Sequence, residues 1–152
     1  MKKTQLNFIG LVLAMVFAFT NPAYGGTLVL DVKADVGAFD AAFAGIGTGC
    51  AFYVPGVIFE AGTDNPIGTF HCWGWDALCD GGIGGAAVVV SQEFNLDGRG
   101  KIQVQGVEDE GPRAVTGGTG QYRNVRGEMT GADLSGFPDF TVTFKLIGAK
   151  SK

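Results

Sequence analysis

The strongest constraint on the fold is an alternation of apolar and polar residues with a period of two. Residues 139–147 read DFTVTFKLI, and threonine or lysine stands between the apolar residues Phe140, Val142, Phe144 and Leu146. Successive side chains of a β-strand point to opposite faces of the sheet. The segment therefore predicts a strand that buries one face and exposes the other, as antiparallel sheets commonly do.

The same alternation recurs along the chain, and no segment shows the 3.6-residue period of a helix. The connections are too short for the crossover that parallel strands need, so neighbouring strands should be antiparallel. The number of predicted strands, eight, favours an all-β fold in the form of an eight-stranded antiparallel β-barrel, because a closed barrel leaves no unpaired strand edge. The Gly/Ala-rich stretch 37–49 is left open as a lid, a bulged strand or a loose connection. The seven other predicted strands are TLVLDVK (27–33), CAFYVPGVIFE (50–60), IGTFHCWGW (67–75), GAAVVVSQEFN (85–95), KIQVQG (101–106), RAVTG (113–117) and VRGEMTGADL (125–134).

Asp97-Gly98 stands between two of these strands and predicts a hairpin turn. A calcium loop is the alternative, because Asn95 and Asp97 both offer oxygen ligands. No downstream carboxylate stands at the spacing that such loops use, so the hairpin is preferred.

The N-terminus reads as a secretory signal peptide. Lys2 and Lys3 precede the apolar run FIGLVLAMVFAF, and small residues lead to a cleavage position near Gly25. We therefore expect residues 1–25 to be removed and residues 26–152 to form a single barrel domain, secreted or periplasmic. No second long apolar segment follows, so no stable membrane anchor is expected. The net charge of −4 argues against a nucleic-acid partner.

Three cysteines, Cys50, Cys72 and Cys79, remain in an exported chain, where an oxidised pair is the usual state. Sequence alone leaves the connectivity open, since Cys72 with Cys79 and Cys50 with either partner are all compatible. A zinc site built on His71 is disfavoured, because the chain has one histidine and adjacent residues rarely both reach one metal. We expect neither a metal nor a cofactor.

The segment AVTGGTGQYRNVRG (114–127) has the glycine content of a nucleotide-binding loop. The dinucleotide fingerprint requires a third glycine and a following helix. Arg123 stands where that glycine is needed, and the residues after it have no apolar stripe at helical spacing. We therefore reject a phosphate cradle.

Residues 97–147 resemble the C-terminal half of allene oxide cyclases and of their relatives, the dirigent proteins. The resemblance rests on VQG, on AVTGGTG followed by Tyr122, on Arg126-Gly127 and on the closing alternating strand. It implies an eight-stranded barrel in which Gly117, Gly118 and Gly120 form a tight turn between strands. Relatives of this kind commonly form dimers or trimers, so a homodimer or homotrimer is expected.

A barrel of this size holds packed side chains or one small ligand. We expect Tyr53, Trp73 and Trp75 to line a ligand pocket, and Glu60 or His71 to move a proton. Arg123 matches the arginine of the dirigent run GGTGxYR, and Glu60, Asp76 and Glu128 are candidates for its acidic partners. Against this stands a structural interpretation, in which the tryptophans pack, His71 is an ordinary strand residue and Glu60 faces water.

Three functions from different classes follow. The preferred one is a cofactor-free, dirigent-like barrel that binds a small apolar or phenolic molecule. The second is an isomerase or cyclase of the allene oxide cyclase type. The third is a structural or interaction barrel without a ligand.

Overall fold

The computed structural model describes residues 25–35, 44–46, 49–77, 88–108, 111–131 and 138–148. The described residues form nine β-strands and a short 3-10 turn, Gly120–Tyr122, without an α-helix. The strands are β1 (Gly25–Ala34), β2 (Ala44–Ile46), β3 (Gly49–Glu60), β4 (Pro66–Asp76), β5 (Val88–Leu96), β6 (Gly100–Val107), β7 (Arg113–Gly118), β8 (Arg126–Gly131) and β9 (Asp139–Ile147).

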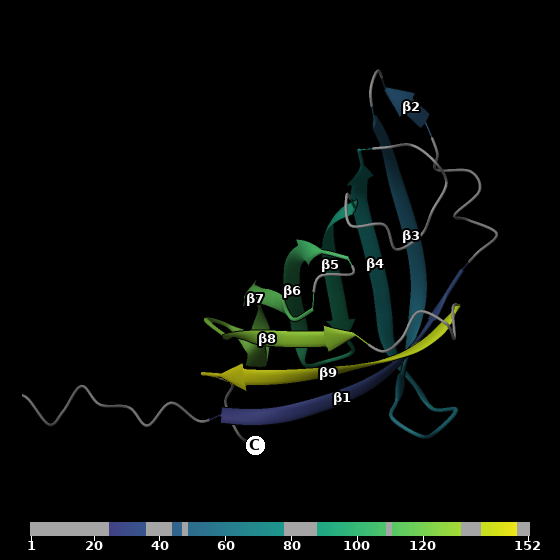
Figure 1. The fold of residues 1–152 in the computed structure, drawn as a ribbon. Coiled ribbons are helices and arrows are strands. Elements are labelled where there is room, and N and C mark those ends of the chain that lie inside the picture. Colours follow the sequence, from purple (N-terminus) through teal and green to yellow (C-terminus); the bar gives the residue numbers. More distant parts are fainter. Residues whose placement is uncertain are drawn as a thin grey trace, which may run out of the picture.

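Eight of these strands close into an antiparallel barrel, which confirms the predicted fold class. The hydrogen-bonded order runs β1-β9-β8-β7-β6-β5-β4-β3, and β1 also pairs with β3 to close the ring. In Figure 1, β1, β8 and β9 run across the long strands β3 to β6. The three-residue strand β2, within the stretch left open above, extends the sheet at the beginning of β3.

The predicted alternation sets which side chains point inward. In β9, Val142, Phe144 and Leu146 are buried, and in β6, Ile102 and Val104 are buried while Gln103 and Gln105 are exposed. The predicted hairpin at Asp97-Gly98 joins β5 and β6, and Gly98 has a φ of 65°. In these strands, the residues that the sequence pattern groups on one apolar face are therefore the ones that point into the barrel.

Aromatic side chains fill one end of the interior. The ring of Phe94 lies 5.1 Å from that of Phe70 and 5.0 Å from that of Phe144, and Phe140 contacts Phe70 edge-on at 5.7 Å. Such tilted and edge-to-face pairs stabilise a core beyond their buried area. This end of the barrel is therefore a packed core rather than a cavity.

Cys72 is a free, buried thiol, so the two predicted disulfides that include it are not formed. It points into the barrel from the middle of β4, where strand pairing fixes its place in the apolar core. The remaining pairing, Cys50 with Cys79, lies outside the residues whose side chains are described.

The predicted signal peptide, apart from Gly25, also lies outside the described residues. Among the residues that are described, no helix is long and apolar enough to span a membrane.

Candidate binding site inside the barrel

The aromatic residues expected to line a pocket lie instead on the outer surface. Tyr53, Trp73 and Trp75 expose 40–42% of their area. The sequence correctly places Trp73 and Trp75 on one face of β4, but the inward face is that of Phe70 and Cys72. Because side chains alternate, the tryptophans point to the outside.

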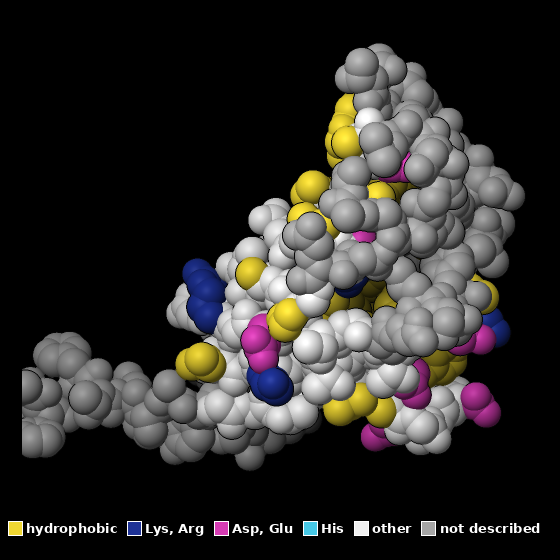
Figure 2. Space-filling view, in the orientation of Figure 1, with side chains coloured by type: hydrophobic (Ala, Val, Ile, Leu, Met, Phe, Trp, Pro, Cys, Tyr) yellow, Lys and Arg dark blue, Asp and Glu magenta, His cyan; other side chains and the backbone are white. Residues whose placement is uncertain are grey.

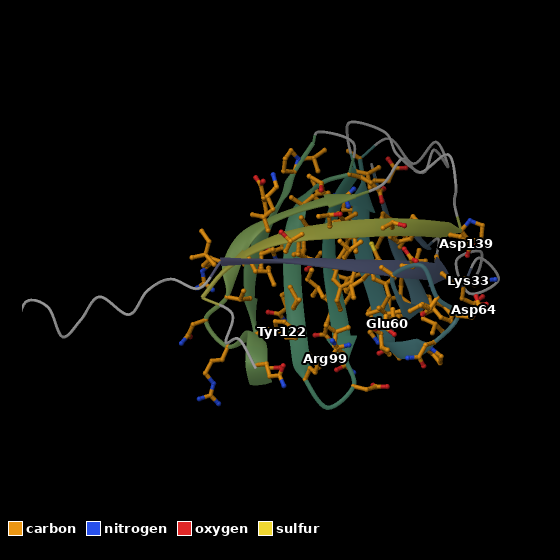
Figure 3. All side chains as sticks on the ribbon, turned by 90° about the horizontal axis from the view of Figure 1, so that it is seen from below. Lys33, Glu60, Asp64, Arg99, Tyr122 and Asp139 are labelled. Atoms are coloured by element: carbon orange, nitrogen blue, oxygen red, sulfur yellow. The ribbon has the colours of Figure 1, made fainter. Side chains whose placement is uncertain are left out.

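The three residues expected to act in catalysis are also outside the interior. Glu60, which is labelled in Figure 3, is exposed where β3 ends, and Arg123 is exposed after the 3-10 turn. His71 points outward from β4, and its Nδ1 atom lies 2.6 Å from the Tyr53 hydroxyl. Their rings are stacked 6.0 Å apart. These side chains do not form a shared site.

The glycine-rich segment forms the turn between β7 and β8. Gly120 has a φ of 59°, and a Cβ there would lie 2.4 Å from the Arg99 carbonyl. Gly118 has no positive φ, but a Cβ would approach the carbonyls of Lys101 and Tyr122 within 2.6 Å. At Gly117 the nearest contact of a Cβ would be 3.7 Å away, so this glycine is not required sterically. The role of this segment is therefore to form the turn. A hydrogen bond from the Gln121 N–H to the Arg99 carbonyl holds the turn against the β5–β6 hairpin.

Polar side chains are buried inside the barrel on the side of the aromatic core where β4 ends. We call Cys72, Gln92 and Arg113 the polar cluster; they expose 3%, 4% and 8% of their area. Arg113 Nη1 donates to Gln92 Oε1 at 3.3 Å, and Gln92 Nε2 lies 3.8 Å from Cys72 Sγ. Three strands thus contribute one connected group of side chains.

Strand register explains how the polar cluster fits. Cys72 lies opposite Gln92, and Gln92 lies opposite Val104. Arg113 packs over Gly106 of β6, where a Cβ would lie 2.9 Å from its Cγ atom. Interior side chains are close-packed, so the glycine in VQG leaves the space that the arginine occupies.

Backbone carbonyls hold the Arg113 guanidinium in place. Its Nε donates to the Val107 carbonyl at 3.4 Å and its Nη2 donates to the Glu108 carbonyl. In the described part of the chain, the ion pairs are Lys101–Glu93 and Lys145–Glu128, and neither involves Arg113. An arginine carries five N–H donors in a fixed plane, so the three bonds leave donor capacity inside the barrel.

The Cys72 thiol is protonated at neutral pH. Burial raises its pKa to about 12, and the nearby Glu108 carboxyl adds to this, while Gln92 and Arg113 act in the opposite direction. Since the thiolate is the nucleophilic form of cysteine, Cys72 acts as a small apolar side chain and not as a nucleophile.

Of the three acidic candidates, Asp76 alone is buried in the interior, with 3% of its area exposed. It points inward from β4, in the same phase as Cys72. Glu60 is exposed, and Glu128 forms an ion pair with Lys145 on the surface at 3.0 Å. The polar end of the interior thus combines a guanidinium, an amide and a carboxyl group.

Apolar side chains surround the polar cluster. In Figure 2, a hollow in the visible face has hydrophobic side chains at its bottom. An apolar enclosure with a few convergent polar groups is the usual form of a small-molecule site. The buried neighbours in the adjoining positions are Phe52, Val54, Val90, Val104, Val115 and Met129.

A second hollow, of about 450 Å³, lies outside the barrel beside β1. The Asp31 carboxylate connects the segments around this hollow, because it accepts hydrogen bonds from the Gly62 N–H and the Thr141 hydroxyl, both at 2.6 Å. Lys33, Asp64 and Asp139 lie together at this end of the barrel in Figure 3. Its lining combines four charged side chains with Val32, Phe59 and Phe140. The interior, where apolar side chains predominate, is therefore the better candidate for an apolar ligand.

Sequence reasoning missed Gln92 and Arg113, although a signal was present. On β5 the side chains that point inward are those of Val88, Val90, Gln92, Phe94 and Leu96, and Gln92 is the polar one among them. On β7, Arg113 stands two residues before the buried Val115, so both point inward. A polar residue at a buried position of a strand requires a hydrogen-bond partner.

In the described ranges, no group of three histidine, cysteine or acidic residues is arranged to hold a metal ion.

Comparison with known proteins shows the fold. No protein-family model and no curated protein matches the chain. A solved structure, described as Pyocyanin demethylase, is similar with a TM-score of 0.60 and 24% sequence identity, covering 80% of this chain and 99% of that one. At this identity the similarity shows a common barrel architecture, and the allene oxide cyclase or dirigent family is not shown.

Proposed function

We propose that this protein is an exported barrel that binds a small apolar or phenolic molecule inside the barrel, without a cofactor. The observation that carries the proposal is the Arg113–Gln92 pair, buried at 8% and 4% exposure in an interior whose other described side chains, apart from Asp76, are apolar. Burying such groups costs free energy unless they are hydrogen-bonded. A ligand oxygen beside them would accept from the remaining donors of Arg113.

The arrangement suggests how a ligand lies. Its apolar body would pack against buried side chains such as Phe52 and Val90, and its phenolic or carbonyl oxygen would face Arg113. A molecule held at both ends presents one face to a reaction partner, which is what a dirigent-like, stereo-directing role requires. The similar barrel described as Pyocyanin demethylase supports the view that this architecture accommodates small molecules.

The first experiment is native mass spectrometry of the protein purified as the cells produce it, to detect a retained small molecule. Calorimetry then compares 2-naphthol with naphthalene, which differ by one phenolic oxygen. A hydrogen bond to a charged group contributes about 1.5–3 kcal/mol, so we expect 2-naphthol to bind at least about tenfold more tightly.

Variants identify the site. Arg113→Met and Gln92→Leu should remove most of the preference for 2-naphthol, whereas the surface variant Glu60→Gln should leave it unchanged. Near-UV circular dichroism checks that each variant is folded. If neither probe binds and no molecule is retained, the barrel is filled and the structural alternative replaces this proposal.

A cofactor-free isomerase or cyclase is the second candidate, and the buried carboxyl of Asp76 favours it. A carboxylate in the interior can remove a proton from carbon, and a guanidinium in the same interior can stabilise the resulting enolate. The test is exchange of the α-protons of 2-tetralone for deuterium in D₂O, followed by NMR. Exchange that is lost in Asp76→Asn supports catalysis, and the absence of exchange in the parent protein rejects it.

A further inference from the structure

Exposed hydrophobic side chains are concentrated on one outer face of the barrel. Seven large hydrophobic residues are exposed among those described, and five of them lie on β3, β4 and β5. Single exposed apolar residues are normal, but a contiguous patch marks an interaction site. We call this group the aromatic face; it comprises Tyr53, Val57, Trp73, Trp75 and Val89.

Strand register makes four of the five members of the aromatic face contiguous, and Val57 lies at its edge. Tyr53 lies directly opposite Trp73, and Trp75 lies directly opposite Val89. Side chains at directly opposite positions have Cβ atoms about 4.5–5.5 Å apart, close enough to touch. The apolar row through Trp75 continues to Ala51 on β3 and Val107 on β6, so it crosses four strands.

The two rows of the face that run through Trp73 and Trp75 carry no charged side chain, although the chain has a net charge of −4, while Val57 at the edge of the face lies opposite Lys33. The row through Trp73 continues with Ser91 and Gln105, which are polar and uncharged. The next row contains Glu93, whose carboxylate is paired with Lys101 at 2.7 Å. Two copies of an acidic protein repel through most of their surface, but they can approach through a neutral face.

We propose that the aromatic face is the contact between two copies of this chain, packed face to face about a two-fold axis. One self-complementary patch generates a closed dimer, whereas a ring of three requires two different patches on each copy. The two exposed hydrophobics outside the face, Val29 and Ile147, lie on β1 and β9 and make no comparable group. The expected assembly is therefore a homodimer.

The composition and size of the face suit this contact. Tryptophan and tyrosine are enriched at interfaces and charged residues are depleted from their centres. Each ring exposes about two fifths of its area, which corresponds to roughly 60–100 Å² per aromatic side chain. The polar residues around them would supply the rest of the roughly 800 Å² per partner that a standard interface buries.

The Tyr53 hydroxyl can be buried in this contact without losing its hydrogen bond. It already lies 2.6 Å from His71 Nδ1 on the same face. Burying an unpaired hydroxyl would cost free energy, so this contact removes one obstacle to association.

The test uses the fact that both tryptophans of the chain, Trp73 and Trp75, lie on the aromatic face. Sedimentation velocity across a wide concentration range gives the mass of the purified protein. Tryptophan emission and acrylamide quenching, recorded over the same range, report on the face itself. We expect a dimer whose emission shifts to shorter wavelength and whose quenching falls as it forms.

The variant Trp73→Glu should sediment as a folded monomer, and the matched variant Ile147→Glu should remain dimeric. Ile147 exposes 53% of its area on another strand, against 42% for Trp73, so this control introduces the same charge at an apolar site that is no less exposed. A parent protein that is monomeric throughout overturns the proposal, and a shift of its emission on phosphatidylcholine vesicles would assign the face to lipid. An oligomer that survives Trp73→Glu overturns it as well.

Discussion

The Nη1 atom of Arg113 donates a hydrogen bond to Oε1 of Gln92 at 3.3 Å, across the strand that separates them. Arg113 begins β7 and Gln92 lies in β5, with β6 between. The bond therefore crosses the inner surface of β6, where Gly106 leaves the space for it. A glycine that binds nothing is thus part of the candidate site.

Replacing Arg113 tests the energetic coupling of this pair. Arg113→Met leaves buried acceptors unpaired and should lower the free energy of unfolding by about 1–3 kcal/mol. The double variant Arg113→Met/Gln92→Leu should cost less than the sum of the two single variants, because the partners are removed together. Urea denaturation measures each value, with the exposed Arg123→Met as control. Strict additivity would show that the two side chains do not interact in solution.

Gly106→Ala should destabilise the barrel by about 1–3 kcal/mol, the usual cost of overpacking. The added Cβ would lie 2.9 Å from Arg113 Cγ and 3.1 Å from its Cβ, and atoms so near the backbone cannot move away easily. Gly131→Ala is the matched control, because its Cβ would lie 3.7 Å from Arg113 Nη1, an ordinary contact. Thermal unfolding compares the two. Equal melting temperatures would mean that Arg113 does not pack against Gly106.

Gly120 and Gly117 of the turn motif should differ in the same way. Gly120→Ala places a Cβ at a φ of 59° and 2.4 Å from the Arg99 carbonyl. A backbone conformation that favours glycine costs about 1–2 kcal/mol for other residues, and the contact adds to this. Gly117→Ala has room and should be nearly neutral or slightly stabilising, because it restricts the unfolded chain. A similar loss in both variants would contradict the steric argument.

The alternation of β1, β6 and β9 was sufficient to predict these strands and which of their residues share a face, because the period of a strand is a local property. Alternation also placed Trp73 and Trp75 on one face. It could not show that this face is the outer one, because both faces of β4 carry large apolar residues. Phe70 and Cys72 decide the matter through their packing with neighbouring strands, which is not encoded locally.

The candidate site was harder to predict than the fold. Glu60 and His71 are candidates because their side chains can transfer protons, and Arg123 because it matches the dirigent run. Their positions on the strands or in a loop nevertheless put each of them outside the interior. Gln92 and Arg113 are 21 residues apart and meet only when β6 lies between their strands. Such a pair depends on how the strands are aligned, which the sequence does not show directly. A polar residue among the inward-pointing apolar residues of a strand is therefore a more useful sequence signal than a reactive side chain.

The Cys72 thiol predicts how stability depends on alkaline pH. Its folded pKa is about 12, against 9.0 for an ordinary thiol. Below pH 9 the thiol is protonated in both states, and its contribution is fully present. Between pH 9 and 12 the unfolded chain loses this proton while the folded chain keeps it, so stability falls as pH rises.

The size of this effect is roughly 4 kcal/mol across the whole window, since one pKa unit corresponds to about 1.4 kcal/mol. Tyr122 acts in the same direction at higher pH, because burial raises its pKa from 10.0. The comparison is therefore made between the parent protein and Cys72→Ala from pH 8 to pH 10, by urea denaturation. The parent should lose stability more steeply above pH 9, and peptide mapping should show Cys72 resistant to iodoacetamide until the protein unfolds. Parallel curves, or rapid native alkylation at Cys72, would mean that the thiol is open to solvent and that the interior beside Gln92 is not closed.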